Sequence, residues 1–141
     1  MGRILSIDYG RKRTGIAVTD PLQIIAQGLT TVATAELSAF LKDYVRREAV
    51  DRFIIGRPVQ PNGQPSENLK RVEDFAKSLQ RQFPDIPITW WDERFTSVMA
   101  HQTMRDAGLG KMKRRDKALV DEISATIILQ SFMESRQNVM F

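Results

Sequence analysis

The stretch RILSIDYGRKRTGIAVTD, residues 3–20, places two apolar runs on either side of a short basic turn. Residues 3–8 and 14–19 are rich in β-branched and apolar side chains and predict two strands joined as a hairpin. The first strand ends in Asp8, and three cations follow at 11–13. A carboxylate at the mouth of a core is costly unless something compensates it. The neighbouring cations and a bound metal ion are the two candidates.

The remainder of the chain predicts an α/β fold. A third strand is expected within 24–32, and a helix with Thr34 as its N-cap is expected over 35–48. The later expected elements are a strand at 52–56, a helix from Ser66 as N-cap to Gln82, a strand at 86–91, a helix over 95–107 and a mostly apolar helix over 117–134. This order predicts a mixed sheet with an antiparallel opening hairpin and helices on both faces.

Length and composition favour a single cytoplasmic domain spanning 1–141. The chain has 141 residues, of which 42% are hydrophobic and 27% charged, close to the averages of globular proteins. It contains no apolar stretch long enough for a membrane span and no secretory signal, so no membrane partner is expected. The absence of cysteine excludes disulfides and thiolate-bound zinc. A metal would therefore need oxygen ligands or the single histidine, His101.

Positive charge is concentrated in one segment. The chain carries a net charge of +4 and has a pI near 9.7. Residues 105–117 contain six cations and two anions, a local excess that equals the charge of the whole chain. A run of this kind is either a solvated loop or a loop that contacts phosphates.

Carboxylates follow two of the expected strands. Asp8 ends the strand at 3–8, and Asp92 with Glu93 closes the strand at 86–91. Ligand sites in open α/β sheets collect just outside the carboxyl ends of strands. One edge of the sheet is therefore expected to carry both acidic groups.

A third carboxylate, Asp121, lies in the expected final helix. The residues that share its helical face are apolar, namely Ala118, Ala125, Ile128 and Phe132. Ionisable residues rarely occupy such a stripe unless they are paired or coordinate a cation. Asp121 is therefore the third candidate for a site at the sheet edge.

Each acidic residue also has a purely structural interpretation. Asp8 could cap the turn that follows it, Asp92 and Glu93 could simply end a strand, and Asp121 or Glu122 could form a surface ion pair. Three acids gathered at one edge would instead repel one another and raise at least one pKa. A hard divalent cation would relieve that repulsion.

Oxygen ligands alone favour Mg²⁺ or Mn²⁺ over zinc. Two such ions about 4 Å apart can activate water on one side of a phosphodiester and stabilise the leaving oxygen on the other. Because Arg13, Arg94 and the basic segment are nearby in the sequence, the backbone of a nucleic acid is the substrate that fits. The sequence thus predicts a metal-dependent phosphodiesterase.

Four segments together resemble the YqgF/RuvX family of bacterial proteins, which has a ribonuclease H-like fold. They are IDYGRKRTGIAVTD at 7–20, IIGRP at 54–58, WDERFTS at 91–97 and DEISATIILQ at 121–130. The resemblance spans essentially the whole chain. It implies a five-stranded mixed sheet in which strand 2 is antiparallel, and a metal-dependent nuclease site. Family members are described as nucleases maturing the 5′ end of pre-16S rRNA in ribosome biogenesis, or as Holliday junction resolvases.

Carried over by motif, the family's acidic positions fall on Asp8, Glu93 and Asp121. As a hypothesis, Asp8 bridges two ions, Glu93 and Asp121 each complete the shell of one ion, and water attacks phosphorus in line. The expected nucleic-acid contacts are Arg13, Arg94, Lys111, Lys113, Arg114 and Arg115. The sequence departs from the family pattern at Gln23, Arg57 and Ser124, none of which removes a ligand.

The two tryptophans and the histidine favour structural roles. Trp90 and Trp91 are adjacent in an expected strand and point to opposite faces of the sheet. In a sheet covered on both sides, core packing is favoured over base stacking. A surface or packed position is likewise favoured for His101.

The sequence is compatible with several functions. DYGRKRTG also resembles the phosphate loop of actin-like ATPases, although those enzymes close two lobes around a nucleotide. A nucleic-acid-binding module for ribosome assembly, with little cleavage, is the rival from another class. The sequence also leaves pre-rRNA and branched DNA as alternative substrates, and junction resolution would require a homodimer to supply two active sites.

Overall fold

A computed structural model describes residues 2–58, 62–63, 66–93, 99–100, 102–103, 105 and 116–139, with side chains as far as residue 136. Its elements in chain order are β1 (Arg3–Tyr9), β2 (Arg13–Thr19), β3 (Ala26–Ala33), the 3₁₀ turn η1 (Thr34–Glu36), α1 (Leu37–Arg47), β4 (Val50–Arg57), α2 (Leu69–Gln82), β5 (Ile88–Asp92) and α5 (Lys117–Val139). No helix among these residues has the length and apolarity that a membrane span requires.

The strands form one five-stranded sheet in the order β3-β2-β1-β4-β5. Strand β2 runs antiparallel to both of its neighbours, whereas β1, β4 and β5 are parallel to one another. The predicted mixed sheet with an antiparallel second strand is therefore confirmed. Because β1, β4 and β5 are parallel, their carboxyl ends lie at the same edge of the sheet.

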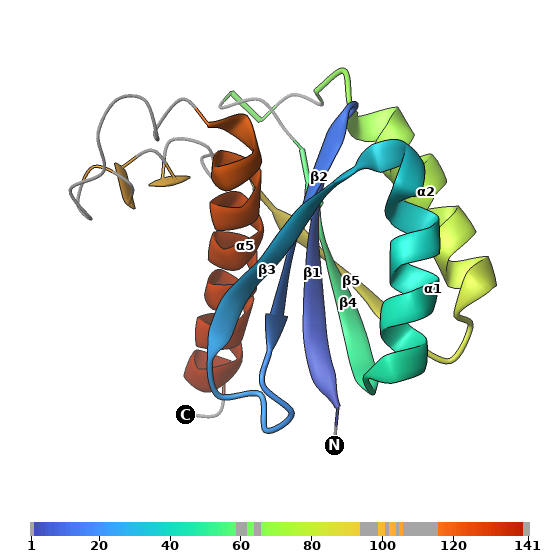
Figure 1. The fold of residues 1–141 in the computed structure, drawn as a ribbon. Helices are drawn as coiled ribbons and strands as arrows, with labels where there is room; N and C mark the ends of the chain where they lie inside the picture. Colours follow the sequence, from blue (N-terminus) through green and yellow to red (C-terminus); the bar gives the residue numbers. More distant parts are fainter. Residues whose placement is uncertain are drawn as a thin grey trace.

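Helices cover both faces of this sheet, as predicted (Figure 1). Helices α1 and α2 pack on one face, where Leu5 and Ile7 of β1 belong to the larger core cluster. Helix α5 packs on the other face, where Ile4 of β1 contacts a smaller cluster. Side chains alternate between the faces along a strand, so Asp8 shares the α5 face with Ile4.

A close approach fixes α5 over the opening hairpin. A Cβ at Gly15 in β2 would collide with the carbonyl oxygen of Asp121, so only glycine permits this packing. The hydroxyl of Ser6 also donates a hydrogen bond of 2.6 Å to the carbonyl oxygen of Ala125. These two contacts place the first turns of α5 beside the end of β1.

Both predicted helix caps are wrong. The hydroxyl of Thr34 donates a 2.7 Å hydrogen bond to the carbonyl oxygen of Gly10, and α1 begins only after the turn η1. Ser66 lies three residues before α2, which has Asn68 at its N-cap position. The amide of Asn68 instead donates a 2.9 Å hydrogen bond to the carbonyl oxygen of Tyr9. The side chains of Thr34 and Asn68 thus bond to the end of β1 and the turn after it, and not to the first turns of the helices.

The two tryptophans differ in burial. Trp91 packs edge-on against Phe132 of α5, with ring centroids 5.9 Å apart, as core packing predicts. Trp90 is 36% exposed, so core packing is the wrong interpretation for this residue. Strand β5 is at the edge of the sheet, and its neighbouring helix leaves the indole uncovered.

The helix expected over 95–107 lies mostly outside the described residues, although those described at 99–100, 102–103 and 105 are helical. His101 also lies outside them. The final helix begins at Lys117 as predicted and continues to Val139, five residues beyond the expected end at 134.

Candidate active site

Two of the predicted carboxylates meet at the edge where the parallel strands end. Asp8 lies near the end of β1, and Glu93 follows β5 directly. Their side chains share a hydrogen bond. Strand β4 lies between them, and a Cβ at Gly56 would stand 2.5 Å from Oε2 of Glu93. Gly56 therefore leaves the space through which the Glu93 carboxyl reaches Asp8.

Asp121, the third predicted carboxylate, lies in the second turn of α5 beside this pair. It is close enough for its charge to raise the pKa of Asp8. Its Oδ2 accepts a 3.1 Å hydrogen bond from Nε of Arg13, and the two half-buried side chains form an ion pair. The structure thus brings all three acids to one edge, with Asp8 and Glu93 in contact and Asp121 held by an arginine.

Crowding and burial disfavour the charged forms of these acids. Burial raises the pKa of Glu93 to about 10, and the charge of Asp8 and the hydrogen bond to it add to the rise. Burial also raises the pKa of Asp8 to about 6, although the hydrogen bond from Glu93 opposes this. Burial also raises the pKa of Asp121 above its usual value, and Arg13 limits this rise. At neutral pH, the carboxyl group of Glu93 therefore stays protonated and donates the hydrogen bond to Asp8.

The donor set fits a hard divalent cation. Two carboxyl groups are forced together in a buried position, at a cost that a cation would offset. Within the described ranges, however, no three acidic or histidine side chains are close enough to hold a metal ion. The carboxylate of Asp121 is instead paired with Arg13. The carboxyl oxygens of Asp8 and Glu93 fit such a cation once Glu93 has lost its proton, and Asp121 is the third carboxylate nearby.

A basic cavity of about 350 Å³ lies beside Asp121. It is formed by the β1–β2 turn and the first turns of α5, and its lining residues are Gly10, Arg11, Lys12, Arg13, Lys117 and Asp121. Arg13 therefore lies beside Asp121, at the edge where its predicted phosphate contact requires it. Lys117 was not among the predicted site residues. Its spacing of four residues before Asp121 was the available signal, because such residues share a helix face.

The other predicted nucleic-acid contacts lie outside the described residues and stay predictions. They are Arg94, Lys111, Lys113, Arg114 and Arg115.

Known proteins resemble this chain along nearly its whole length. The model of the RuvX family, described as "Holliday junction resolvase", matches residues 2–135. A protein of Bacteroides fragilis is 61% identical over 137 residues, covering 97% of this chain and 99% of its own. A protein of Porphyromonas gingivalis is 62% identical over 135 residues, covering 96% of this chain and 98% of its own. Both bear the name "Putative pre-16S rRNA nuclease".

Solved structures of resolvases share the fold. The fowlpox virus resolvase, in a complex with Holliday junction DNA, gives a TM-score of 0.59 at 16% identity and covers 94% of this chain and 97% of its own. RuvC of T. thermophilus, also in a complex with a Holliday junction substrate, gives a TM-score of 0.57 at 14% identity and covers 97% of this chain and 96% of its own. These matches confirm the ribonuclease H-like fold. The family model and the close relatives show that this chain belongs to the RuvX family.

Proposed function

We propose that this chain is a metal-dependent nuclease that processes the 5′ end of pre-16S rRNA. The observation that carries the proposal is the contact between the carboxyl groups of Asp8 and Glu93, together with the basic cavity that Asp121 lines. A protein that only bound nucleic acid would have no use for acids placed where they repel one another. The close relatives support the substrate, because they are named for this rRNA precursor. Such processing would take place in the cytoplasm.

Three carboxylates would hold the metal, which we propose to be two Mg²⁺ or Mn²⁺ ions. Asp8 and Glu93 are already adjacent, and Asp121 is the third ligand. Bound ions of this kind lower the pKa of water and neutralise charge on a phosphodiester. Carboxylate oxygens are ligands that suit Mg²⁺ and Mn²⁺.

The chain's own residues bind the substrate and manage protons. Glu93 holds a proton that it must give up before it can act as a ligand. Arg13 and Lys117 border the cavity beside the acids and would contact phosphate oxygens there. When Asp121 turns toward the other acids, the guanidinium of Arg13 becomes available to a phosphate. The basic residues outside the described ranges would extend this contact.

Cleavage of a defined RNA tests this function. Wild-type protein with Mg²⁺ or Mn²⁺ should cut an RNA that contains the 5′ leader of pre-16S rRNA. Asp8→Asn keeps the size of the side chain and removes the shared charge, and we expect at least about a 100-fold loss of rate. Asp43→Asn, on the exposed side of α1, is the matched control and should cut normally. Unchanged cleavage by Asp8→Asn would make the assignment wrong.

A Holliday junction resolvase is the second candidate, favoured by the description of the family model. Resolution requires two cuts and hence a homodimer. A mobile four-way junction should be compared with the leader RNA under one buffer. Faster cleavage of the junction by a dimeric protein would favour the resolvase. If the triple variant with alanine at Asp8, Glu93 and Asp121 retained RNA binding and its cellular role, the chain would instead be a binding module.

A further inference from the structure

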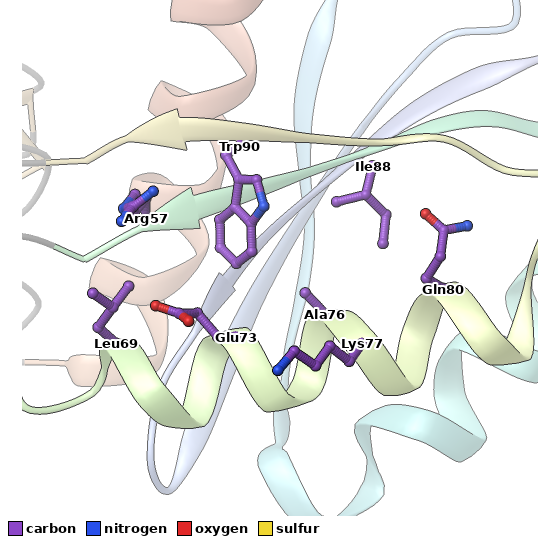
Figure 2. Close-up of a pocket in the computed structure, with 8 residues that line it drawn as sticks. All are labelled: Arg57, Leu69, Glu73, Ala76, Lys77, Gln80, Ile88 and Trp90. Carbon is purple, nitrogen blue, oxygen red and sulfur yellow. The ribbon is translucent and has the colours of Figure 1, made fainter.

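A second cavity, of about 410 Å³, lies between α2 and the edge strand β5. Trp90 and Ile88 of β5 form one side of it, and Ala76 of α2 forms part of the other. Figure 2 shows the indole of Trp90 extending from β5 toward α2, with Arg57 beside it. The volume is within the range of cavities that bind small molecules.

The cavity exposes an aromatic surface that the fold does not use. The indole of Trp90 is 36% exposed, although its neighbour Trp91 is packed against Phe132. The side chain beneath it, Ala76, is small and buried, so the space over α2 is left open. An exposed indole in a cavity of this size is suited to stacking with a planar ring.

Charged groups surround this aromatic surface. Arg57 and Lys77 contribute two positive charges and Glu73 one negative charge, which leaves a net positive charge at the cavity. Among the residues that the structure describes, none of these three side chains forms an ion pair. Two cations next to an indole match a ligand that has both an aromatic ring and a phosphate.

The cavity reaches the end of β4, the strand that lies between β1 and β5. Arg57 is the last residue of β4, and its carbonyl oxygen accepts a 3.2 Å hydrogen bond from the backbone N–H of Glu93. Arg57 and Trp90 lie on the face covered by α2, whereas Asp8 lies on the face covered by α5. A chain passing from one site to the other must bend over the ends of β4 and β5. An unpaired strand can bend in this way, and a stiff duplex cannot.

We propose that this cavity binds an unpaired RNA nucleotide that flanks the cleaved segment, with its base stacked on Trp90 and its phosphate next to Arg57 and Lys77. The identity of the polymer rests on the proposed function. The proposal adds that the substrate has a single-stranded flank, which the enzyme holds on the opposite face of the sheet from the acids.

Binding measured without cleavage tests the proposal. An RNA hairpin with a single-stranded tail and the same hairpin without a tail are titrated in EDTA. Wild-type protein should bind the tailed RNA more tightly, and Trp90→Ala should weaken binding of that RNA about 10-fold while leaving the blunt hairpin unaffected. Trp90→Phe retains an aromatic ring and should recover most of the difference. Lys77→Ala should weaken tail binding, whereas Lys70→Ala, exposed on the same helix and outside the cavity, should not.

Fluorescence gives a second measurement that does not depend on a truncated side chain. The chain has two tryptophans, so Trp91→Phe leaves Trp90 as the sole tryptophan whose fluorescence is measured. The tailed RNA should quench this emission, and the quenching should saturate at the concentration that saturates binding. Emission that stays unchanged at saturating RNA would overturn the proposal.

The outcomes distinguish this proposal from the proposed function. If wild-type protein cleaves no RNA but loses tail binding on Trp90→Ala, the cavity assignment stands and the nuclease function fails. If the leader RNA is cleaved normally and Trp90→Ala binds both hairpins like the wild type, the nuclease function stands and the cavity assignment fails. In that second case a protein segment, rather than RNA, would be the ligand to test next.

Discussion

The carboxyl groups of Asp8 and Glu93, which lie far apart in the sequence, share a hydrogen bond at the carboxyl ends of parallel strands. The bond requires a proton on one of the two groups. Burial and mutual repulsion place that proton on Glu93, whose pKa is raised to about 10. This shared proton makes the pair sensitive to pH and to any cation that replaces it.

The stability of the metal-free protein should fall as pH rises. The pKa of Glu93 is raised from 4.5 to about 10 and that of Asp8 from 3.8 to about 6, so the folded state binds more protons than the unfolded state between these values. The stability that these two raised pKa values contribute is fully present below about pH 4 and is lost progressively up to about pH 10. Melting temperatures in EDTA across this range measure the slope.

A matched pair of variants assigns that slope to the site. Glu93→Gln cannot ionise and still donates a hydrogen bond to Asp8, so it should flatten the pH dependence and raise the melting temperature at pH 8 by several degrees. Glu36→Gln, exposed before α1, should leave the profile unchanged. Equal slopes for Glu93→Gln and the wild type would contradict the raised pKa.

Gly15→Ala should disturb both stability and activity. The added methyl group would collide with the backbone of Asp121 and Glu122, so α5 must move away from β2. We expect a loss of about 1–3 kcal/mol in the free energy of unfolding, together with a fall in cleavage. Chemical denaturation and the RNA assay measure the two effects.

Gly28→Ala is the matched control for this prediction, because the atoms nearest to its methyl group would belong to the side chain of Glu122, which can rotate away. Its effect on stability and cleavage should therefore be clearly smaller. If both variants lower the free energy of unfolding by the same amount, the backbone contact at Gly15 does not fix the position of α5.

Lys117 should contribute to RNA affinity through the phosphate backbone. It borders the basic cavity at the start of α5. Removing one phosphate contact should reduce the slope of log Kd against log salt concentration by about 0.7–0.9. Lys117→Ala is compared with Lys42→Ala, which lies exposed on α1. An unchanged slope for Lys117→Ala would exclude a phosphate contact at this position.

Sequence reasoning predicted the fold and the meeting of two acids because both follow from strand order. Asp8 and Glu93 each lie at the end of an apolar run, and parallel strands bring such ends to one edge. The third acid was predicted from the apolar stripe around Asp121. Its partner Arg13 was predicted to hold phosphate, and the ion pair between the two depends on side-chain geometry that no sequence spacing specifies.

The errors have a common physical origin. Thr34 and Ser66 are good caps by residue type, but the hydroxyl of Thr34 bonds to Gly10, far away in the sequence, and α2 begins three residues after Ser66. Trp90 was assigned to the core because helices cover both faces of the sheet. Its exposure depends on the edge position of β5 and on the small side chain of Ala76 opposite, which become evident only in the folded molecule.

The most direct test of this account is anomalous diffraction from crystals soaked in MnCl₂. We predict manganese density bounded by the carboxylates of Asp8 and Glu93, with Asp121 turned from Arg13 toward the metal. Crystals of Asp8→Asn, treated in the same way, should lack this density. Soaked wild-type crystals in which Asp121 stays on Arg13, and in which no manganese lies between the acids, would contradict the account.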